Sequence, residues 1–211
     1  MTRALRALTL ACLAALPAAG AAQAQADNGL YEAVRDPDAS FVRLIIPGKT
    51  YGKVASAGVA DLHNGVSNYI HVEPGEIKVA VAGAESSFTV APRSFYSVVL
   101  AEDGTPVPLP DTLQSNPAKA DITFFNLTDT DALDLFVPRA RANVAEAVPQ
   151  GQNSSVAVKA PLTLDFEVRA GDAVLASVAG VELRRKEGVT IIATGTGGDY
   201  TAFALENAFV N

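Results

Sequence analysis

The sequence predicts an all-β protein made of two small antiparallel β-sandwich domains in tandem, joined by a proline-rich connector. Apolar runs of roughly four to eight residues, bounded by Gly, Pro, Asn or Asp and rich in Val, Ile, Phe, Tyr and Thr, recur along the chain, which is typical of strands. Helical periodicity is scarce. The second half also repeats the order of runs in the first half, as tandem copies of one domain would.

Residues 1–26 have the features of a cleavable secretory signal peptide. Arg3 and Arg6 precede an apolar run that is too short to span a bilayer, and two Ala-x-Ala cleavage sites follow within residues 22–26. An N-terminal membrane anchor is the alternative interpretation. Because the only cysteine, Cys12, lies in this segment, the secreted chain would have no thiol and no disulfide, and we expect it in the periplasm.

The charge of the chain limits its partners. Acidic residues number 23 against 16 basic ones, so the net charge is −7 at neutral pH. Loss of the predicted signal, which carries basic but no acidic residues, makes the secreted chain more acidic still. This excess of negative charge argues against a nucleic acid or an anionic membrane as partner, and it disfavours a polyanionic glycan held by charge alone.

We predict the first β-sandwich over residues 27–103, with about six strands and a turn roughly every ten residues. The turns contain proline–glycine pairs, at Pro47-Gly48 and Pro74-Gly75. The runs that we interpret as strands are SFVRLII (40–46), YGKVASAGVADL (51–62), SNYIHV (67–72), EIKVAVAG (76–83), SSFTVAP (86–92) and RSFYSVVL (93–100).

Residues 104–120 are predicted to form the connector. This segment carries four prolines and little apolar periodicity. Because proline locks φ and removes a backbone donor, we expect a connection here and no core strand.

The second β-sandwich is predicted over residues 121–211. DITFFNL, which begins at Asp121, repeats FVRLII, which begins at Phe41, at an offset of 80 residues. The offset grows to 94 residues between Val98 and Ile192, so we expect longer loops in the second copy. The alternative is one continuous sandwich of about 12 strands.

No catalytic constellation is evident, and we predict no catalytic residue, no metal ligand and no cofactor. The sequence lacks a G-x-S-x-G nucleophile motif, and we interpret His63 as a turn residue and His71 as an outward-facing strand residue. A hairpin that joined both to Glu73 and Glu76 would resemble a metal site, but exposed positions are the favoured interpretation. The acidic segment 126–134 lacks the spacing of an EF-hand calcium loop.

Sugar binding by aromatic stacking has weak support. Tryptophan is absent and aromatic residues make up 7% of the chain, which leaves Tyr31, Tyr51, Tyr69 and Tyr96 as candidate sugar contacts. The basic cluster ELRRKEG (182–188) is predicted to be a charged hairpin turn, with a docking patch as the alternative.

Four segments of the chain resemble those of one known family. Leu30-Tyr31 and the later Ser40-Phe41-Val42-Arg43 resemble its Leu-Tyr pair and the Ser-Phe-Val-Arg strand that follows. The other three segments are FYSVVLAEDGTPVPLPD (95–111), ADITFFNLTD (120–129) and GVELRRKEGVTIIATGTGG (180–198). The family is AlgF, whose members take part in periplasmic O-acetylation of alginate.

The resemblance implies a role in the O-acetylation of alginate or a related exopolysaccharide. In such systems a membrane O-acyltransferase passes acetyl groups across the inner membrane, and a periplasmic SGNH-type acetyltransferase places them on the polymer. We therefore interpret the chain as a non-catalytic adaptor that bridges these two partners, with the polysaccharide as a further candidate partner. The alternatives are a periplasmic glycan-binding module, a covalent acetyl carrier or transferase that uses a Ser, Thr or His, with His63 or a turn serine as the first candidate, and a surface adhesin.

The candidate interaction residues are Tyr31, Phe41, Arg43, Tyr69 and His71. A core position is also expected for Phe41, since a phenylalanine in an alternating strand usually faces inward. For Arg43 we keep two interpretations, an outward-facing docking residue and the partner of a buried acid.

Overall fold

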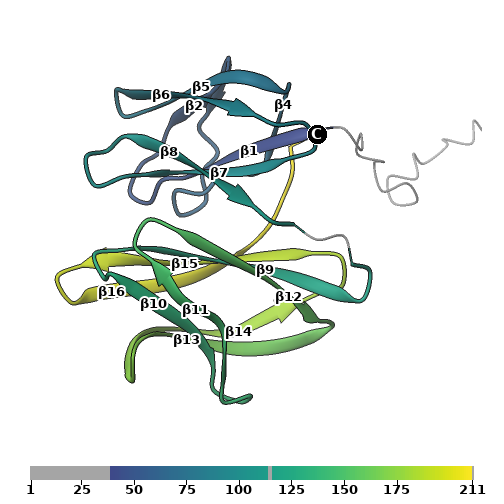
Figure 1. Ribbon diagram of the computed structural model, residues 1–211, viewed down its shortest axis with the longest axis vertical. Helices are drawn as coiled ribbons and strands as arrows, with labels where there is room; N and C mark the ends of the chain where they lie inside the picture. Colours follow the sequence, from purple (N-terminus) through teal and green to yellow (C-terminus); the bar gives the residue numbers. More distant parts are fainter. Residues whose placement is uncertain (1–38, 114–115, 211) are drawn as a thin grey trace, which may run out of the picture. The chain divides into compact units, whose positions relative to one another are not determined.

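The structure is a computed structural model that describes residues 39–113 and 116–210, and these ranges contain strands and no α-helix (Figure 1). The predicted signal peptide, Cys12 and Tyr31 lie outside the described residues. Within the described ranges, no helix has the length and apolar character that crossing a bilayer requires.

Each half of the chain contributes eight strands, two more than predicted for the first half. Those of the first half are β1 (Ser40–Ile45), β2 (Gly52–Val54), β3 (Ala57–Val59), β4 (Ile70–Val72), β5 (Gly75–Val81), β6 (Ala84–Val90), β7 (Phe95–Leu100) and β8 (Pro106–Asp111). Those of the second half are β9 (Lys119–Thr128), β10 (Ala132–Val137), β11 (Ala142–Pro149), β12 (Asn153–Lys159), β13 (Leu162–Ala170), β14 (Ala173–Leu183), β15 (Gly188–Thr196) and β16 (Asp199–Glu206).

The two halves have the same strand order. The first half forms the sheets β4-β1-β7-β8 and β3-β2-β5-β6, and the second forms β12-β9-β15-β16 and β11-β10-β13-β14. Every strand of the second half therefore takes the place of the strand numbered eight lower. Even the two parallel pairs, β1 with β7 and β9 with β15, correspond, although the other pairs are antiparallel. The predicted all-β fold with two sandwich-like halves is confirmed.

Strand pairing also fixes which residues correspond between the copies. Leu44 lies opposite Val98, and the equivalent Phe124 lies opposite Ile191. Val98 therefore corresponds to Ile191, so the predicted match to Ile192 is wrong by one residue. Each strand has two adjacent apolar residues here, Val98-Val99 and Ile191-Ile192, so the sequence alone left the alignment ambiguous. The pairing of the strands removes this ambiguity.

Each half has its own core between its two sheets. One cluster of buried side chains, including Leu44 and Val98, belongs to the first half, and another, including Phe124 and Ile191, belongs to the second. β1 and β9 are buried on both faces, as central parallel strands usually are.

A third buried cluster joins the halves. It contains Ile45 and Val99 from the first half together with their equivalents Phe125 and Ile192 from the second. These residues belong to β1, β7, β9 and β15, so the sheet β4-β1-β7-β8 packs on the sheet β12-β9-β15-β16. The two sandwiches meet through the same face of the same sheet.

The connector predicted over residues 104–120 is too long, because Pro106–Asp111 form β8 at the edge of its sheet. Ala101 N–H donates to Thr105 O at 2.9 Å, and because hydrogen-bonded and non-hydrogen-bonded pairs alternate, this bond determines which residues of β8 are hydrogen-bonded to β7. In this pattern the three prolines of β8 occupy the positions whose N–H would point away from β7. Edge strands tolerate proline at such positions, and the missing donors protect the edge from pairing with another chain.

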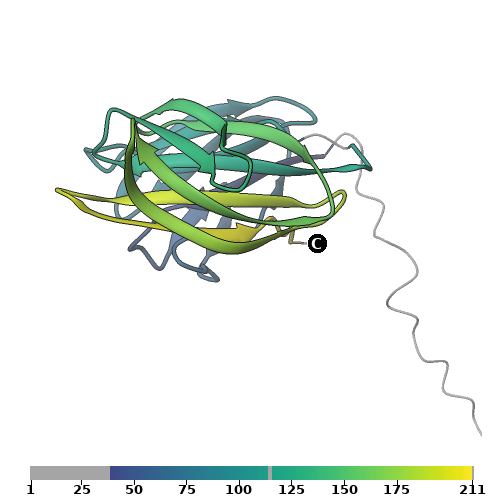
Figure 2. The same cartoon turned by 90° about the horizontal axis from the view of Figure 1, so that it is seen from below.

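Two turns of the second half were predicted. Gly197 and Gly198 form the tip of the β15–β16 hairpin, as expected, and Figure 2 shows this hairpin as one continuous yellow ribbon. Residues 184–187 form a turn, but they connect β14 and β15, which belong to different sheets. The prediction of a hairpin there is therefore wrong, because a turn signal does not reveal whether its flanking strands pair.

Candidate functional site

Arg43 in β1 joins the two halves of the chain through a buried polar network. Its side chain is 2% exposed. Within the first half, its Nε donates to Ser97 Oγ at 2.7 Å, and its Nη2 lies 3.6 Å from Asp111 Oδ2. Toward the second half, its Nη1 donates to Thr190 Oγ1 at 2.8 Å and to Asn207 Oδ1 at 2.9 Å. One guanidinium therefore contacts β7, β8, β15 and the residue after β16.

The Asp111 carboxylate is the anionic centre of this network. Its Oδ2 accepts hydrogen bonds from Tyr69 Oη at 2.6 Å and Ser97 Oγ at 2.5 Å, while Oδ1 accepts one from Asn153 Nδ2 at 3.0 Å. The Asp111 side chain is fully buried, so its negative charge depends on Arg43 for compensation.

Tyr69 serves this network as a hydrogen-bond donor. Burial raises the pKa of the Tyr69 hydroxyl well above its ordinary value of 10.0; the neighbouring Asp111 raises the pKa further, while Arg43 opposes the shift. The hydroxyl therefore keeps its proton at neutral pH. Tyr69, Ser97 and Asp111 are all buried, so a substrate has no direct access to these groups.

The network forms where equivalent positions of the two copies meet. Arg43 pairs with Ser97 in β7, and Thr123 pairs with Thr190 in β15, so Thr123 and Thr190 are the second-copy counterparts of Arg43 and Ser97. In the β7–β8 hairpin, Asp111 lies opposite Phe95. In the β15–β16 hairpin, the pairing continued by one residue places Asn207 opposite Gly188, and Asn207 N–H donates to Gly188 O at 2.8 Å. Asn207 is therefore the counterpart of Asp111. Only the first copy supplies the charged pair.

An aromatic cluster lies next to this network. The Phe41 ring stacks on Phe95 with centroids 5.4 Å apart and meets the His71 ring edge-on at 5.8 Å. Tyr69 stacks on Phe209 at 5.0 Å, and the Arg43 guanidinium lies over the Tyr69 ring at 4.4 Å. Phe209 also contacts Phe41 edge-on, so all these side chains form one cluster.

The C-terminal segment completes the cluster by returning to the first half. Tyr69 N–H donates to Ala208 O, and Val210 N–H donates to Tyr69 O, each at 2.8 Å. Figure 1 shows this segment leaving β16 and ending beside β1 and β4. The last described residues of the predicted second domain therefore pack against the first.

The structure thus brings four of the five predicted interaction residues together. Phe41, Arg43 and Tyr69 are buried, and His71 is exposed. For Arg43, the interpretation as partner of a buried acid describes its contacts. Sequence reasoning missed Asp111 and the polar residues that contact Arg43, namely Ser97, Thr190 and Asn207. The available signal was Arg43 itself, because an arginine within an apolar strand needs an acceptor from elsewhere in the chain.

The acidic segment 126–134, considered for calcium binding, uses its polar groups in hydrogen bonds within the protein. Asn126 Nδ2 donates to Thr130 O and Val148 O, each at 3.0 Å, and Asn126 Oδ1 accepts from the hydroxyl of Thr128 at 2.7 Å. Among the residues that the structure describes, no three His, Cys, Asp or Glu side chains are grouped so that they could hold a metal ion.

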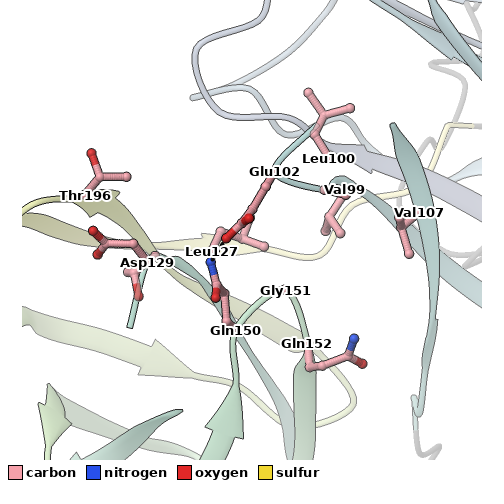
Figure 3. Close-up of a pocket in the computed structure, with 12 residues that line it drawn as sticks. Val99, Leu100, Glu102, Val107, Leu127, Asp129, Gln150, Gly151, Gln152 and Thr196 are labelled. Carbon is pink, nitrogen blue, oxygen red and sulfur yellow. Dashed lines mark hydrogen bonds between the residues drawn. The ribbon is translucent and has the colours of Figure 1, made fainter. Parts of the chain in front are cut away.

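A groove of about 810 Å³ opens at the surface between the two halves (Figure 3). The first half supplies the end of the β7–β8 hairpin, and the second supplies the ends of β9 and β15 and the β11–β12 turn. Its apolar lining comes from Val99, Leu100, Val107 and Leu127. Its polar lining includes Glu102, Thr128, Asp129, Gln150, Gln152 and Thr196.

Two carboxylates give this groove a negative charge. Glu102 accepts a hydrogen bond from Gln150 Nε2 at 2.7 Å, a contact between the two halves. Asp129 accepts one from the Gly197 N–H and one from the Tyr200 hydroxyl, each at 2.8 Å. These bonds lower the pKa of Asp129, so its carboxylate is ionised at neutral pH.

The fold and the site define an internally duplicated β-sandwich protein whose two halves are joined by the buried polar network around Arg43. The family described as "Alginate O-acetyl transferase AlgF" matches residues 11–190. Because this match spans most of the chain, the protein belongs to the AlgF family, and the resemblance seen in the sequence is confirmed. It therefore belongs with the proteins of alginate O-acetylation.

Among solved structures, the chain is similar to the C-terminal domain of AlgF from P. aeruginosa. The two share 21% sequence identity, and the match covers 43% of this chain and 99% of that domain with a TM-score of 0.38. None of the curated proteins matches the chain.

Proposed function

We propose that this protein is a periplasmic, non-catalytic adaptor for the O-acetylation of alginate or a related exopolysaccharide. It holds the membrane O-acyltransferase that delivers acetyl groups close to the SGNH-type acetyltransferase that places them on the polymer. Membership of the AlgF family supports the pathway. The finer role rests on how the two halves are joined.

The observation that carries this proposal is the Arg43 network. It connects both halves through buried hydrogen bonds, and the apolar cluster around Ile45 and Phe125 adds sheet-to-sheet packing. A body fixed in this way presents two partners at a constant spacing. Their effective concentration then rises without the entropy cost of ordering a flexible linker.

The chemistry of the described surface supports a protein partner over the polymer. Alginate is a polyanion, whereas the groove carries the carboxylates of Glu102 and Asp129 on a chain with a net charge of −7. Like charges repel the polymer at this position. Of the predicted interaction residues that the structure describes, His71 is exposed and is the one we propose for direct contact with a partner.

Purification of tagged protein from detergent-solubilised native envelope, followed by mass spectrometry, tests the adaptor role. We expect the membrane O-acyltransferase and the SGNH-type acetyltransferase to co-purify. Absence of both, together with retention of the protein on an alginate column, would contradict the adaptor role and support the glycan-binding alternative. The exposed Tyr51 is then the first sugar contact to substitute, because an exposed ring can stack on a sugar.

A further inference from the structure

The acidic groove has a counterpart on the same molecule. A second groove of about 680 Å³ is lined by residues that include Lys49, Leu62, Asn64, Thr201 and Phe203. Here the β15–β16 hairpin of the second half meets the segments after β1 and β3 of the first half. The construction is the same as in the acidic groove, with the contributions of the two halves exchanged.

Corresponding residues line the two grooves. Val107 pairs with Val99 in β7–β8, and Phe203 pairs with Ile192 in β15–β16, so Val107 and Phe203 are equivalent. By the 80-residue offset of β1 and β9, Lys49 is the counterpart of Asp129. The pair of grooves therefore follows from the duplication and from the packing of the two sheets, while the charge at this equivalent position is opposite.

The lining of the acidic groove suits an extended peptide. Leu100, Val107 and Leu127 are partly buried and offer apolar surface to alternate side chains. The amide of Gln152 and the hydroxyl of Thr196 can form hydrogen bonds with a peptide backbone. The prolines of β8 lack backbone donors, so binding by strand addition to that edge is disfavoured.

We propose that this groove is the docking site for an extended basic segment of a protein partner, with lysine or arginine side chains pairing with Glu102 and Asp129. The inference deepens the proposed adaptor function and rests on it for the identity of the partner. It follows from charge complementarity together with the apolar lining, since a polyuronate would be repelled here. Neither half forms the groove alone, which gives the buried Arg43 network a functional consequence.

Two synthetic decapeptides provide the direct test, one alternating lysine with valine and the other alternating glutamate with valine. Each is titrated into the purified, isotopically labelled secreted chain, and backbone amide resonances are followed by NMR. We expect the lysine peptide to shift the resonances of Leu127, Gln150, Gly151 and Thr196, and the glutamate peptide to leave them unchanged. Binding should weaken as salt is added.

Charge-neutral variants locate the site. The double variant Glu102→Gln, Asp129→Asn keeps side-chain size, and we expect the Kd for the lysine peptide to rise about tenfold. Lys49→Gln in the second groove is the matched control and should leave the Kd unchanged. Absence of lysine-peptide binding, equal binding of both peptides, or shifts confined to other surfaces would each overturn the inference.

Co-purification from the envelope separates this inference from the adaptor function. If the acetylation proteins co-purify equally well with the wild type and with the double variant, the docking site is wrong while the adaptor function stands. If the lysine peptide binds in the groove but no acetylation protein co-purifies, the basic-peptide site stands and the adaptor function fails. We expect both the peptide and the partner to be lost together in the double variant.

Discussion

The two copies of the sandwich share their strand order but differ in the side chains that they bring to their common interface. The first copy presents Arg43, Ser97 and Asp111, while the second presents Thr123, Thr190 and Asn207 at the equivalent positions. Duplication supplied two matching sheet faces, and divergence placed a buried ion pair on one of them. The comparison indicates that the charged residues of the first copy specify how the halves join, whereas the topology of each half does not depend on them.

The largest expected effect on stability comes from removing the charge of Arg43 in the first copy. Arg43→Met leaves the Asp111 carboxylate buried without its counter-charge, and we expect the free energy of unfolding to fall by about 3–5 kcal/mol. Thr123→Val, at the equivalent position of the second copy, removes one neutral hydrogen bond to Ser155 and should cost about 1 kcal/mol. Urea unfolding followed by circular dichroism measures both, and equal losses would show that the two copies contribute alike.

A smaller loss is expected where the C-terminal segment returns to the first half. Phe209→Ala removes the ring that stacks on Tyr69 and contacts Phe41, and we expect a loss of about 2 kcal/mol. Val210→Ala is the matched control, because this side chain is half exposed and should change stability by less than about 0.5 kcal/mol. If both variants are equally stable, the segment does not hold the halves together.

Tyr69 makes the stability of the folded protein depend on pH in the alkaline range. Its pKa in the folded protein is raised, so its contribution to stability is complete below the unfolded value of about 10 and is lost as the pH rises from there toward the folded pKa. We expect the wild type to lose stability above pH 10 and its phenolate absorbance to include a component that appears only on unfolding. Tyr69→Phe should lack that component, and an identical alkaline profile in the variant would contradict the assignment.

The smallest effect concerns the acidic groove. Hydrogen bonds from the Gly197 N–H and the Tyr200 hydroxyl lower the pKa of Asp129 below 3.8, so the stability that they contribute is present above that pH and is lost as the pH falls through the folded pKa. Asp129→Asn should therefore show a slightly weaker loss of stability on acidification than the wild type in urea midpoints between about pH 5 and pH 2. Lys49→Gln, at the equivalent position, should follow the wild-type curve throughout.

The sequence supported prediction of the fold class and the repeat because both depend on local signals. Runs such as SFVRLII and DITFFNL, with turns between them, identify strands and reveal the duplication. β8 was missed because its three prolines indicate a connector unless the strand is known to lie at an edge.

Long-range contacts lay beyond sequence reasoning. The partners of Arg43 are up to 164 residues away along the chain, so no local pattern indicates Thr190 or Asn207. The groove depends likewise on the packing of one sandwich against the other, and its residues come from separate turns. Besides Arg43 itself, the long apolar runs in β1 and β9 were an indication, because burial of a strand on both faces implies a further layer.

We propose that one molecule of this protein binds both acetylation enzymes at once. Two-step affinity purification tests it directly, first through a tag on this chain and then through a tag on the SGNH-type acetyltransferase, with the membrane O-acyltransferase quantified in the final eluate. We predict that the O-acyltransferase is recovered after both steps with the wild type. If either enzyme docks in the acidic groove, the O-acyltransferase should be absent from the final eluate of the Glu102→Gln, Asp129→Asn variant. Recovery of each enzyme with this chain in the first step, but never of both in the second, would contradict the bridging role.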